Sequence, residues 1–311
     1  MTDNQIHAFH WHLFLAPKHW ASWIGFFLLW LLSRLPFDTQ LSIGRLIGKL
    51  AWIALPGRKS VTLTNLGFAF PEKSEQQKLK LARQVYDHVG MTIAEEASLW
   101  FRPADFYLDR FDVHGTEHLD DALKLGRGVV LLQAHFSLIE INMAKLGPVY
   151  PISVVFDPPK NELFAAFLAN RRARFLRSLV DNRQMRPMIR KLKQGEVVWY
   201  SPDQSVSLSR GGIETTFFGQ PVLTTAGTGR IAGMTGAQVL PFVPTRHSDT
   251  GRYTIRIGEV LTFEGPDEKM ATQKINDLFE SQIRQQPEQY FWMHKRFKPP
   301  PGQGYKNPYS L

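Results

Sequence analysis

The sequence of 311 residues contains no cysteine. Disulfide bonds, catalysis by a thiolate and metal sites with cysteine ligands are therefore excluded. The sequence also contains no G-x-S-x-G and no H-E-x-x-H segment. These absences argue against the serine elbow of α/β-hydrolases and against that type of zinc site. No internal repeat and no linker-like stretch divides the chain, which favours one layered domain.

Two glycine-containing segments resemble nucleotide-binding loops but do not match them. The stretch from Gly44 to Lys49 lacks one spacer residue of the phosphate loop and continues with Leu50 instead of serine or threonine. The glycines at 227, 229 and 233 miss the dinucleotide fingerprint by one residue, and no strand directly precedes them. We therefore expect no nucleotide cofactor, and no cofactor or metal of any other kind.

The longest uncharged N-terminal run, His19 to Ser33, has 15 residues, fewer than the roughly 20 that a perpendicular membrane-spanning helix needs. Its tryptophans suit the headgroup zone of a bilayer. No small-residue cleavage site follows the run, so a removed signal peptide is not expected. We predict that residues 1–35 form a retained membrane anchor, as a short transmembrane helix or an interfacial helix. A buried helix of the globular core is the alternative.

The balance of charge is strongly basic, with a formal net charge of +9 and a pI near 9.7. Nucleic acid, anionic lipid and an acidic carrier protein would all suit such a surface. Aromatic residues make up 12% of the chain and include eight tryptophans, which favours a membrane surface, and no nucleic-acid motif is present. If the anchor spans the membrane, the cations that follow it outnumber Lys18 before it. The body of the protein is then expected to face the cytoplasm.

The most informative stretch runs from Gly128 to Glu140. It begins as a valine- and leucine-rich run typical of a buried strand, then reaches His135 and, five residues later, Glu140 as the pattern turns helical. The two side chains can converge at the carboxyl end of that strand, where open α/β sheets place their sites. An imidazole held by a carboxylate is suited to act as a general base. The alternative is structural, because Ser137 and Glu140 also form a capping-box pattern.

The remaining pattern alternates between strands and helices and predicts an α/β domain with a largely parallel sheet. The expected helices cover 41–55, 74–100, 116–125, 137–145, 162–179, 185–193 and 270–285, and the expected strands after the first cover 152–156, 196–200, 239–243, 253–257 and 259–263. Asp203 lies just beyond the strand 196–200, at a second strand end. Arg171, Arg172, Arg174 and Arg177 are clustered within the helix expected over 162–179, where they form either a solvated face or a phosphate site.

Four segments in order resemble the late acyltransferases of lipid A biosynthesis, which transfer lauroyl and myristoyl groups and belong to the wider glycerol-3-phosphate and lysophospholipid acyltransferase superfamily. His135 to Glu140 resembles the H-x4-E catalytic motif of that family. Asn161 with Arg172 and Arg174 is similar to its second block, and 195–204, with Asp203 and Gln204, to its third. Residues 287–297 resemble the C-terminal signature. The resemblance extends from the N-terminal anchor to about Lys298.

The resemblance implies a glycerol-3-phosphate acyltransferase-like domain over residues 36–311, behind an inner-membrane anchor and facing the cytoplasm. It implies transfer of a lauroyl or myristoyl group from acyl carrier protein to a hydroxyl on an acyl chain of Kdo(2)-lipid IV(A), with His135 and Glu140 as catalytic residues. Arg172, Asp203, Arg174, Asn161 and Gln204 become substrate-binding candidates. Without a covalent nucleophile, direct transfer is expected rather than an acyl-enzyme.

Other functions remain open at this point. A phosphatidylinositol mannoside-type or other glycolipid acyltransferase would share similar motifs. A membrane protein that binds anionic lipid without catalysis would keep the fold and not need His135. A hydrolase would release free fatty acid, and a nucleic-acid binder would use the basic charge but leaves the tryptophan-flanked N-terminal run unexplained.

Overall fold

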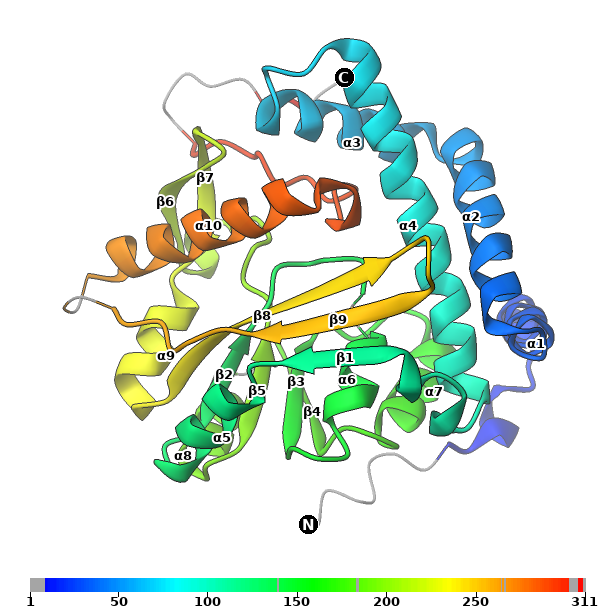
Figure 1. Cartoon of the computed structure of the whole chain (residues 1–311), viewed down its shortest axis with the longest axis horizontal. Helices are drawn as coiled ribbons and strands as arrows, with labels where there is room; N and C mark the ends of the chain where they lie inside the picture. The colour runs from blue at the N-terminus through cyan, green and yellow to red at the C-terminus, as the bar shows by residue number, and fades with distance from the viewer. Residues whose placement is uncertain are drawn as a thin grey trace.

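The computed structural model describes residues 9–138, 140–182, 185–263, 265, 267–301 and 307–309. A seven-stranded sheet lies at the centre of this part of the chain, with helices on both faces (Figure 1). Its strands, in spatial order, are β1 (Phe111–His114), β9 (Arg252–Ile257), β8 (Gln238–His247), β2 (Val129–Leu132), β5 (Val197–Tyr200), β3 (Ile152–Phe156) and β4 (Ser178–Asp181). Only β8 and β9 pair antiparallel, and the other neighbours are parallel. The predicted mixed, largely parallel sheet is thereby confirmed.

Helices bury the sheet on both sides, which explains why β2 reads as a continuous apolar run. Val129 and Leu131 of β2 face one hydrophobic core, and Val130 and Leu132 face the other. The first core is formed with α4 (Glu75–Phe101), α5 (Thr116–Lys124), α6 (Glu140–Leu146) and α7 (Glu162–Arg172). The second is formed with α3 (Pro56–Ala69), α8 (Met185–Lys193), α9 (Gly227–Thr235) and α10 (Glu268–Gln285).

Outside these layers lie two N-terminal helices, a hairpin and several short helical turns. Helix α1 (Trp20–Ser33) and helix α2 (Phe37–Ala54) pack against α4 along one flank of the molecule (Figure 1). The hairpin consists of β6 (Gly212–Phe217) and β7 (Gln220–Thr225) and packs against α10. The 3₁₀ turns are Trp11–Phe14, Pro17–His19, Ala104–Phe106, Leu108–Arg110, Leu208–Arg210 and Pro287–Gln289.

The glycines that superficially resembled a phosphate loop have a packing role. A Cβ on Gly90 of α4 would lie 2.1 Å from the carbonyl oxygen of Gly44, and a Cβ on Gly48 would lie 2.2 Å from the carbonyl oxygen of Tyr86. Only glycine permits this distance between two helix backbones. Gly44 and Gly48 are therefore needed where α2 crosses close to α4.

Helix α1 buries one face and exposes the other. Phe26 stacks on Phe167 of α7 with ring centroids 4.1 Å apart, and Ser22 accepts a hydrogen bond from Asn161. The opposite face carries exposed Trp20, Ile24, Phe27 and Leu28. The helix has 14 residues. Throughout the described ranges, no helix combines the length and the apolar character needed to cross a membrane.

Several boundaries predicted from the sequence are wrong. The helix expected over 162–179 ends at Arg172, and Ser178–Asp181 instead forms β4, which pairs with β3 at the sheet edge. The strand expected over 259–263 is absent from that described stretch, where Gly258 and Leu261 donate single backbone hydrogen bonds to Pro241 and Val239. Helix α3 and the β6–β7 hairpin were not predicted. For β4, pairing with the distant strand β3 outweighs the local helical pattern.

Candidate active site

The loop that follows β2 carries His135 to the end of the neighbouring strand β5. The backbone N–H of Gln133 donates to the carbonyl of Tyr200 at 3.2 Å, so the two strands end side by side. Asp203 lies beyond Tyr200 and is fully buried. Its Oδ1 lies 2.5 Å from Nδ1 of His135, and its Oδ2 accepts the backbone N–H of His135 at 3.0 Å. One carboxylate therefore fixes both the ring and the backbone of His135.

The protonation equilibria of both residues are shifted. Burial opposes ionisation of Asp203, but the charge and hydrogen bonds of His135, together with the Tyr290 hydroxyl, lower its pKa to about 2. Burial also disfavours the imidazolium, yet the Asp203 carboxylate outweighs burial and raises the pKa of His135. An ionised Asp203 on Nδ1 leaves Nε2 as the ring nitrogen that can accept a proton. The His135 side chain is 23% exposed, so a substrate can reach the ring.

The C-terminal segment completes the support of this loop. Tyr290 donates its hydroxyl to Oδ2 of Asp203 at 2.8 Å, and burial raises its pKa well above the ordinary tyrosine value, so it stays a donor. Phe291 donates its backbone N–H to the carbonyl of His135 at 2.9 Å. Tyr290 is therefore a site residue that the spacing argument missed. The only signal for it in the sequence was its place in the C-terminal signature.

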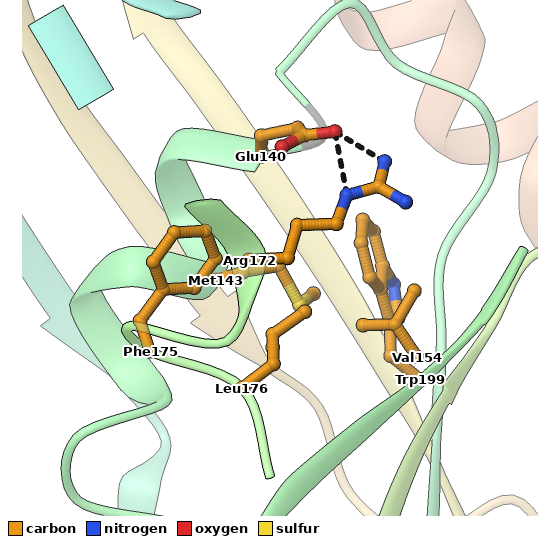
Figure 2. Close-up of a pocket in the computed structure, with 7 residues that line it drawn as sticks. All are labelled: Glu140, Met143, Val154, Arg172, Phe175, Leu176 and Trp199. Atoms are coloured by element: carbon orange, nitrogen blue, oxygen red, sulfur yellow. Dashed lines mark hydrogen bonds and ion pairs between the residues drawn. The ribbon is translucent and has the colours of Figure 1, made fainter. Parts of the chain in front are cut away.

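Glu140 does not hold His135, contrary to the expected pairing. No hydrogen bond or ion pair joins the two residues, both of which lie in the described part of the chain. Glu140 instead begins α6 and accepts Nε of Arg172 at 2.9 Å, with a second contact from Nη2 (Figure 2). The expected His–Glu dyad is thus replaced by two pairs, His135–Asp203 and Glu140–Arg172. The capping box is not formed either, because Ser137 as N-cap requires a helix that begins at Leu138, and Leu138 is not helical.

The Glu140–Arg172 pair borders a small cavity between α6, α7 and the sheet. Figure 2 shows the Arg172 guanidinium facing Glu140, with apolar side chains around its aliphatic part. The residues that line the cavity are Glu140, Met143, Val154, Arg172, Phe175, Leu176 and Trp199. Its volume is only about 10 Å³, roughly one water molecule. Oε2 of Glu140 and Nη1 of Arg172 are buried without a hydrogen-bond partner in the described structure.

The other substrate-binding candidates have mostly structural surroundings. Arg174 donates to the carbonyls of Leu99, Trp100 and Arg102 at 3.3 Å each, at the C-terminal end of α4. Asn161 caps α7 by accepting the N–H of Phe164 at 3.0 Å. Gln204 follows Asp203 and is half-buried.

The two remaining arginines of the cluster also point to different partners. Arg171 lies 4.9 Å from the ring centroid of Phe167, and Arg177 pairs with Glu196 at 3.0 Å. Of the four arginines, Arg172 is the one paired with Glu140. The cluster is therefore not a single phosphate site.

Two further titratable groups lie close to the pairs and were not predicted. Burial and the neighbouring Glu140 raise the pKa of Glu96, on α4, to about 8. Burial and the charge of His135 lower the pKa of His294 to about 4. Within the described residues, no group of three or more histidine, aspartate or glutamate side chains is arranged to hold a metal ion.

A buried aspartate that orients a histidine at the carboxyl edge of a parallel sheet is the arrangement of a general-base enzyme. The cysteine-free sequence adds no thiol nucleophile to it. Comparison with known sequences identifies the particular family. The chain belongs to the bacterial lipid A biosynthesis acyltransferases, whose family model matches residues 7–299.

Characterised relatives cover nearly the whole chain. The lipid A biosynthesis lauroyltransferase of Escherichia coli is 33% identical over 92% of this chain and 94% of its own length. The lipid A biosynthesis palmitoleoyltransferase of the same organism is 31% identical over 93% and 94%. The lipid A biosynthesis myristoyltransferase of E. coli is 25% identical over 92% and 89%. The protein is therefore an acyltransferase of lipid A biosynthesis.

Proposed function

We propose that this acyltransferase moves a lauroyl or myristoyl group from acyl carrier protein to a hydroxyl on an acyl chain of Kdo(2)-lipid IV(A). The observation that carries the proposal is the His135–Asp203 pair, in which Asp203 occupies Nδ1 and leaves Nε2 as the nitrogen that can act as a base. A hydroxyl is a weak nucleophile and needs a base as it attacks a thioester. The lauroyltransferase relative, 33% identical, supports the choice of acyl chain.

In the proposed reaction, Nε2 of His135 accepts the proton of the acceptor hydroxyl. At the same time, the oxygen of that hydroxyl bonds to the carbonyl carbon of the thioester. The C–S bond of the thioester then breaks, an ester remains on the acceptor, and the leaving thiolate takes the proton from His135. Asp203 keeps the imidazole in one tautomer and stabilises the imidazolium between these steps. No covalent enzyme intermediate is required.

The Glu140–Arg172 pair is proposed to bind rather than to carry protons. Nη1 of Arg172 has no hydrogen-bond partner among the described residues, and it lies beside Glu140, next to the loop that bears His135. Guanidinium groups recognise phosphate through paired hydrogen bonds. We assign Arg172 to a phosphate of the lipid acceptor or of the carrier's phosphopantetheine, with Glu140 holding the guanidinium in place. The net charge of +9 suits both an acidic carrier and an acidic glycolipid.

We further propose that α1 and α2 rest on the cytoplasmic surface of the inner membrane. Both helices expose large apolar side chains: Trp20, Ile24, Phe27 and Leu28 on α1, and Leu46, Leu50 and Ile53 on α2. Lys49, an exposed residue of α2, is suited to anionic headgroups. Sedimentation with anionic vesicles tests this part. Ile53→Asp combined with Leu50→Asp is expected to reduce binding, whereas unchanged binding would contradict the assignment of α2.

The reaction itself is tested by incubating the purified protein with a labelled tetra-acylated Kdo(2)-lipid IV(A) and separate lauroyl, myristoyl and palmitoleoyl carrier proteins. Mass analysis is expected to find the penta-acylated lipid with a lauroyl or myristoyl donor. His135→Ala should fold normally and lose about 10²–10⁴-fold in rate, the range for a general base. Free fatty acid as the main product would indicate a hydrolase. Lipid binding without any transfer would indicate a non-catalytic lipid-binding protein.

A further inference from the structure

We propose that a buried polar network centred on Arg246, Glu95 and Thr92 positions the catalytic loop, by holding Ser137 between His135 and Glu140. This inference rests on the proposed function, because it assigns these residues an effect on the acyl-transfer rate. Among the described residues, no hydrogen bond or ion pair joins these three side chains to His135 or Glu140. They are therefore positioning residues, which act through the loop.

The centre of the network is an ion pair that is completely enclosed. Nε and Nη2 of Arg246 on β8 donate to the two carboxylate oxygens of Glu95 on α4 at 2.6 Å each. Tyr253 of β9 donates its hydroxyl to Oε1 of Glu95 at 2.8 Å. Nη1 of Arg246 lies 2.7 Å from Nδ1 of His88, whose pKa burial and Arg246 lower to about 2. A neutral His88 can therefore accept this hydrogen bond.

From this centre the contacts converge on Ser137. Thr92 accepts Nη2 of Arg246 at 3.2 Å and donates its own hydroxyl to the carbonyl of Ser137 at 2.7 Å. Nη1 of Arg246 reaches Oγ of Ser137 at 3.4 Å. The backbone N–H of Ser137 donates to the backbone carbonyl of Gln289 at 2.7 Å. The side-chain amide of Gln289 in turn accepts the backbone N–H of Arg246 and donates to the Arg246 carbonyl. The N–H, the carbonyl and the hydroxyl of Ser137 are thus all engaged.

These contacts can affect catalysis because of where Ser137 lies in the loop. It lies two residues after His135 and three before Glu140, so it fixes the chain between the two functional pairs. A displacement of about 1 Å at a reacting group can reduce a rate by about 10²-fold. Because Ser137 is buried, stability alone would favour partners for its polar groups. Its place between the two functional pairs is therefore what supports the inference, and the measurements below separate positioning from stability.

A second buried carboxylate provides a matched comparison. Glu196 pairs with Lys191 at 3.4 Å and with Arg177 at 3.0 Å, and it accepts a hydrogen bond from Ser153. It precedes β5, so it lies at the amino end of the sheet, opposite to His135. Glu196→Gln therefore perturbs a buried ion pair of similar kind without touching the catalytic loop.

The test measures kcat and KM of acyl transfer for Glu95→Gln, Glu196→Gln, Thr92→Val and Thr92→Ser, each corrected for its folded fraction. Glutamine at position 95 keeps the size of the side chain but can present an amide NH₂ to Arg246. We expect kcat to fall by about 10²-fold in Glu95→Gln and by about fivefold in Thr92→Val, which loses the hydroxyl that joins Arg246 to the carbonyl of Ser137. KM should stay near the wild-type value. Thr92→Ser restores the hydroxyl and should restore the rate, and Glu196→Gln should retain it.

Amide hydrogen exchange of the peptide that contains residues 135–138 gives a readout that is independent of activity. Exchange there should accelerate in Thr92→Val and not in Thr92→Ser. Equal kcat for Thr92→Val and Thr92→Ser, with unchanged exchange, would overturn the proposal even if Glu95→Gln failed to fold. An inactive wild-type protein would instead contradict the proposed function, and the exchange experiment would still decide whether the network orders the loop.

Discussion

The molecule contains two similar buried arginine–glutamate pairs. Arg246 of β8 binds Glu95 of α4, and Arg172 of α7 binds Glu140 of α6. They differ in whether all their polar atoms have partners. In Arg246–Glu95, both carboxylate oxygens and all three guanidinium nitrogens have partners. In Arg172–Glu140, Oε2 and Nη1 are buried without a partner in the described part of the chain, beside a cavity. Buried polar groups are normally satisfied, and exceptions call for an explanation. The first pair is therefore satisfied within the protein, whereas the second keeps a donor and an acceptor for a further partner, which supports our proposal that Arg172 binds a ligand.

The same contrast separates Asp203, which holds His135, from Glu140, which was expected to hold it. Asp203 is fully satisfied by His135 and Tyr290, and its position is determined by β5. Glu140 starts a short helix and depends on Arg172 from another helix. Asp203 thus has the surroundings of a fixed orienting group, whereas Glu140 is held by a side chain from another helix.

Breaking the two ion pairs should have the largest effect on stability, and an unequal one. Arg246→Met leaves Glu95 charged, unpaired and fully enclosed, which is expected to lower the free energy of unfolding by about 3–5 kcal/mol. Arg172→Met leaves Glu140 at the border of a cavity, and a smaller loss of about 1–3 kcal/mol is expected. Urea denaturation of both variants measures the difference. A larger loss for Arg172→Met would invalidate the distinction between the pairs.

A conservative change at Arg172 should affect activity more than stability. Arg172→Lys keeps the charge but loses the fork that binds Glu140 and a phosphate together. We expect the rate to fall by about tenfold or more, the equivalent of one charge-assisted hydrogen bond, with near-normal stability. Arg177→Lys is the matched control, since Arg177 is largely exposed and pairs with Glu196 away from the site.

Rates for these two lysine variants should be measured at low and at moderate salt. Screening weakens a diffuse surface attraction far more than a buried contact. Equal and salt-sensitive losses in Arg172→Lys and Arg177→Lys would leave only a general basic surface.

The smallest expected effect belongs to Arg174, which the sequence placed among the substrate-binding candidates. Its hydrogen bonds to the last carbonyls of α4 are 3.3 Å long. Arg174→Gln should lower the free energy of unfolding by about 0.5–1.5 kcal/mol and leave kcat and KM unchanged. A rise in KM for either substrate, with unchanged stability, would contradict this and indicate that Arg174 binds substrate.

The sequence predicted the sheet and the position of the site because both depend on local patterns. The apolar run before His135 and the strand before Asp203 were recognisable, and parallel strands place their carboxyl ends at one edge. The partners of each side chain could not be predicted. His135 and Glu140 are close in the chain, which favoured pairing them, but the loop turns His135 towards Asp203, 68 residues away.

The arginine cluster illustrates the same limit. Helical periodicity indicated that its four members could not meet one ligand, and the structure gives each a different partner. Periodicity could not show that α7 ends at Arg172 and that β4 follows, because strand pairing with β3 decides that boundary. Glu95 and Arg246 carried no local signal at all, since they meet only when α4 packs on β8.

The pH dependence of kcat/KM for Asp203→Asn and Glu140→Gln tests the central claim most directly, namely that Asp203 and not Glu140 orients the catalytic base. The acid limb of this profile reports deprotonation of His135 in the free enzyme. The Asp203 carboxylate raises the pKa of His135 against the effect of burial, so its removal should move the acid limb to lower pH while the plateau falls. In Glu140→Gln, the limb should stay at the wild-type pH and only the plateau should fall. A limb that moves in Glu140→Gln and stays in place in Asp203→Asn would contradict this account and reinstate the His135–Glu140 dyad.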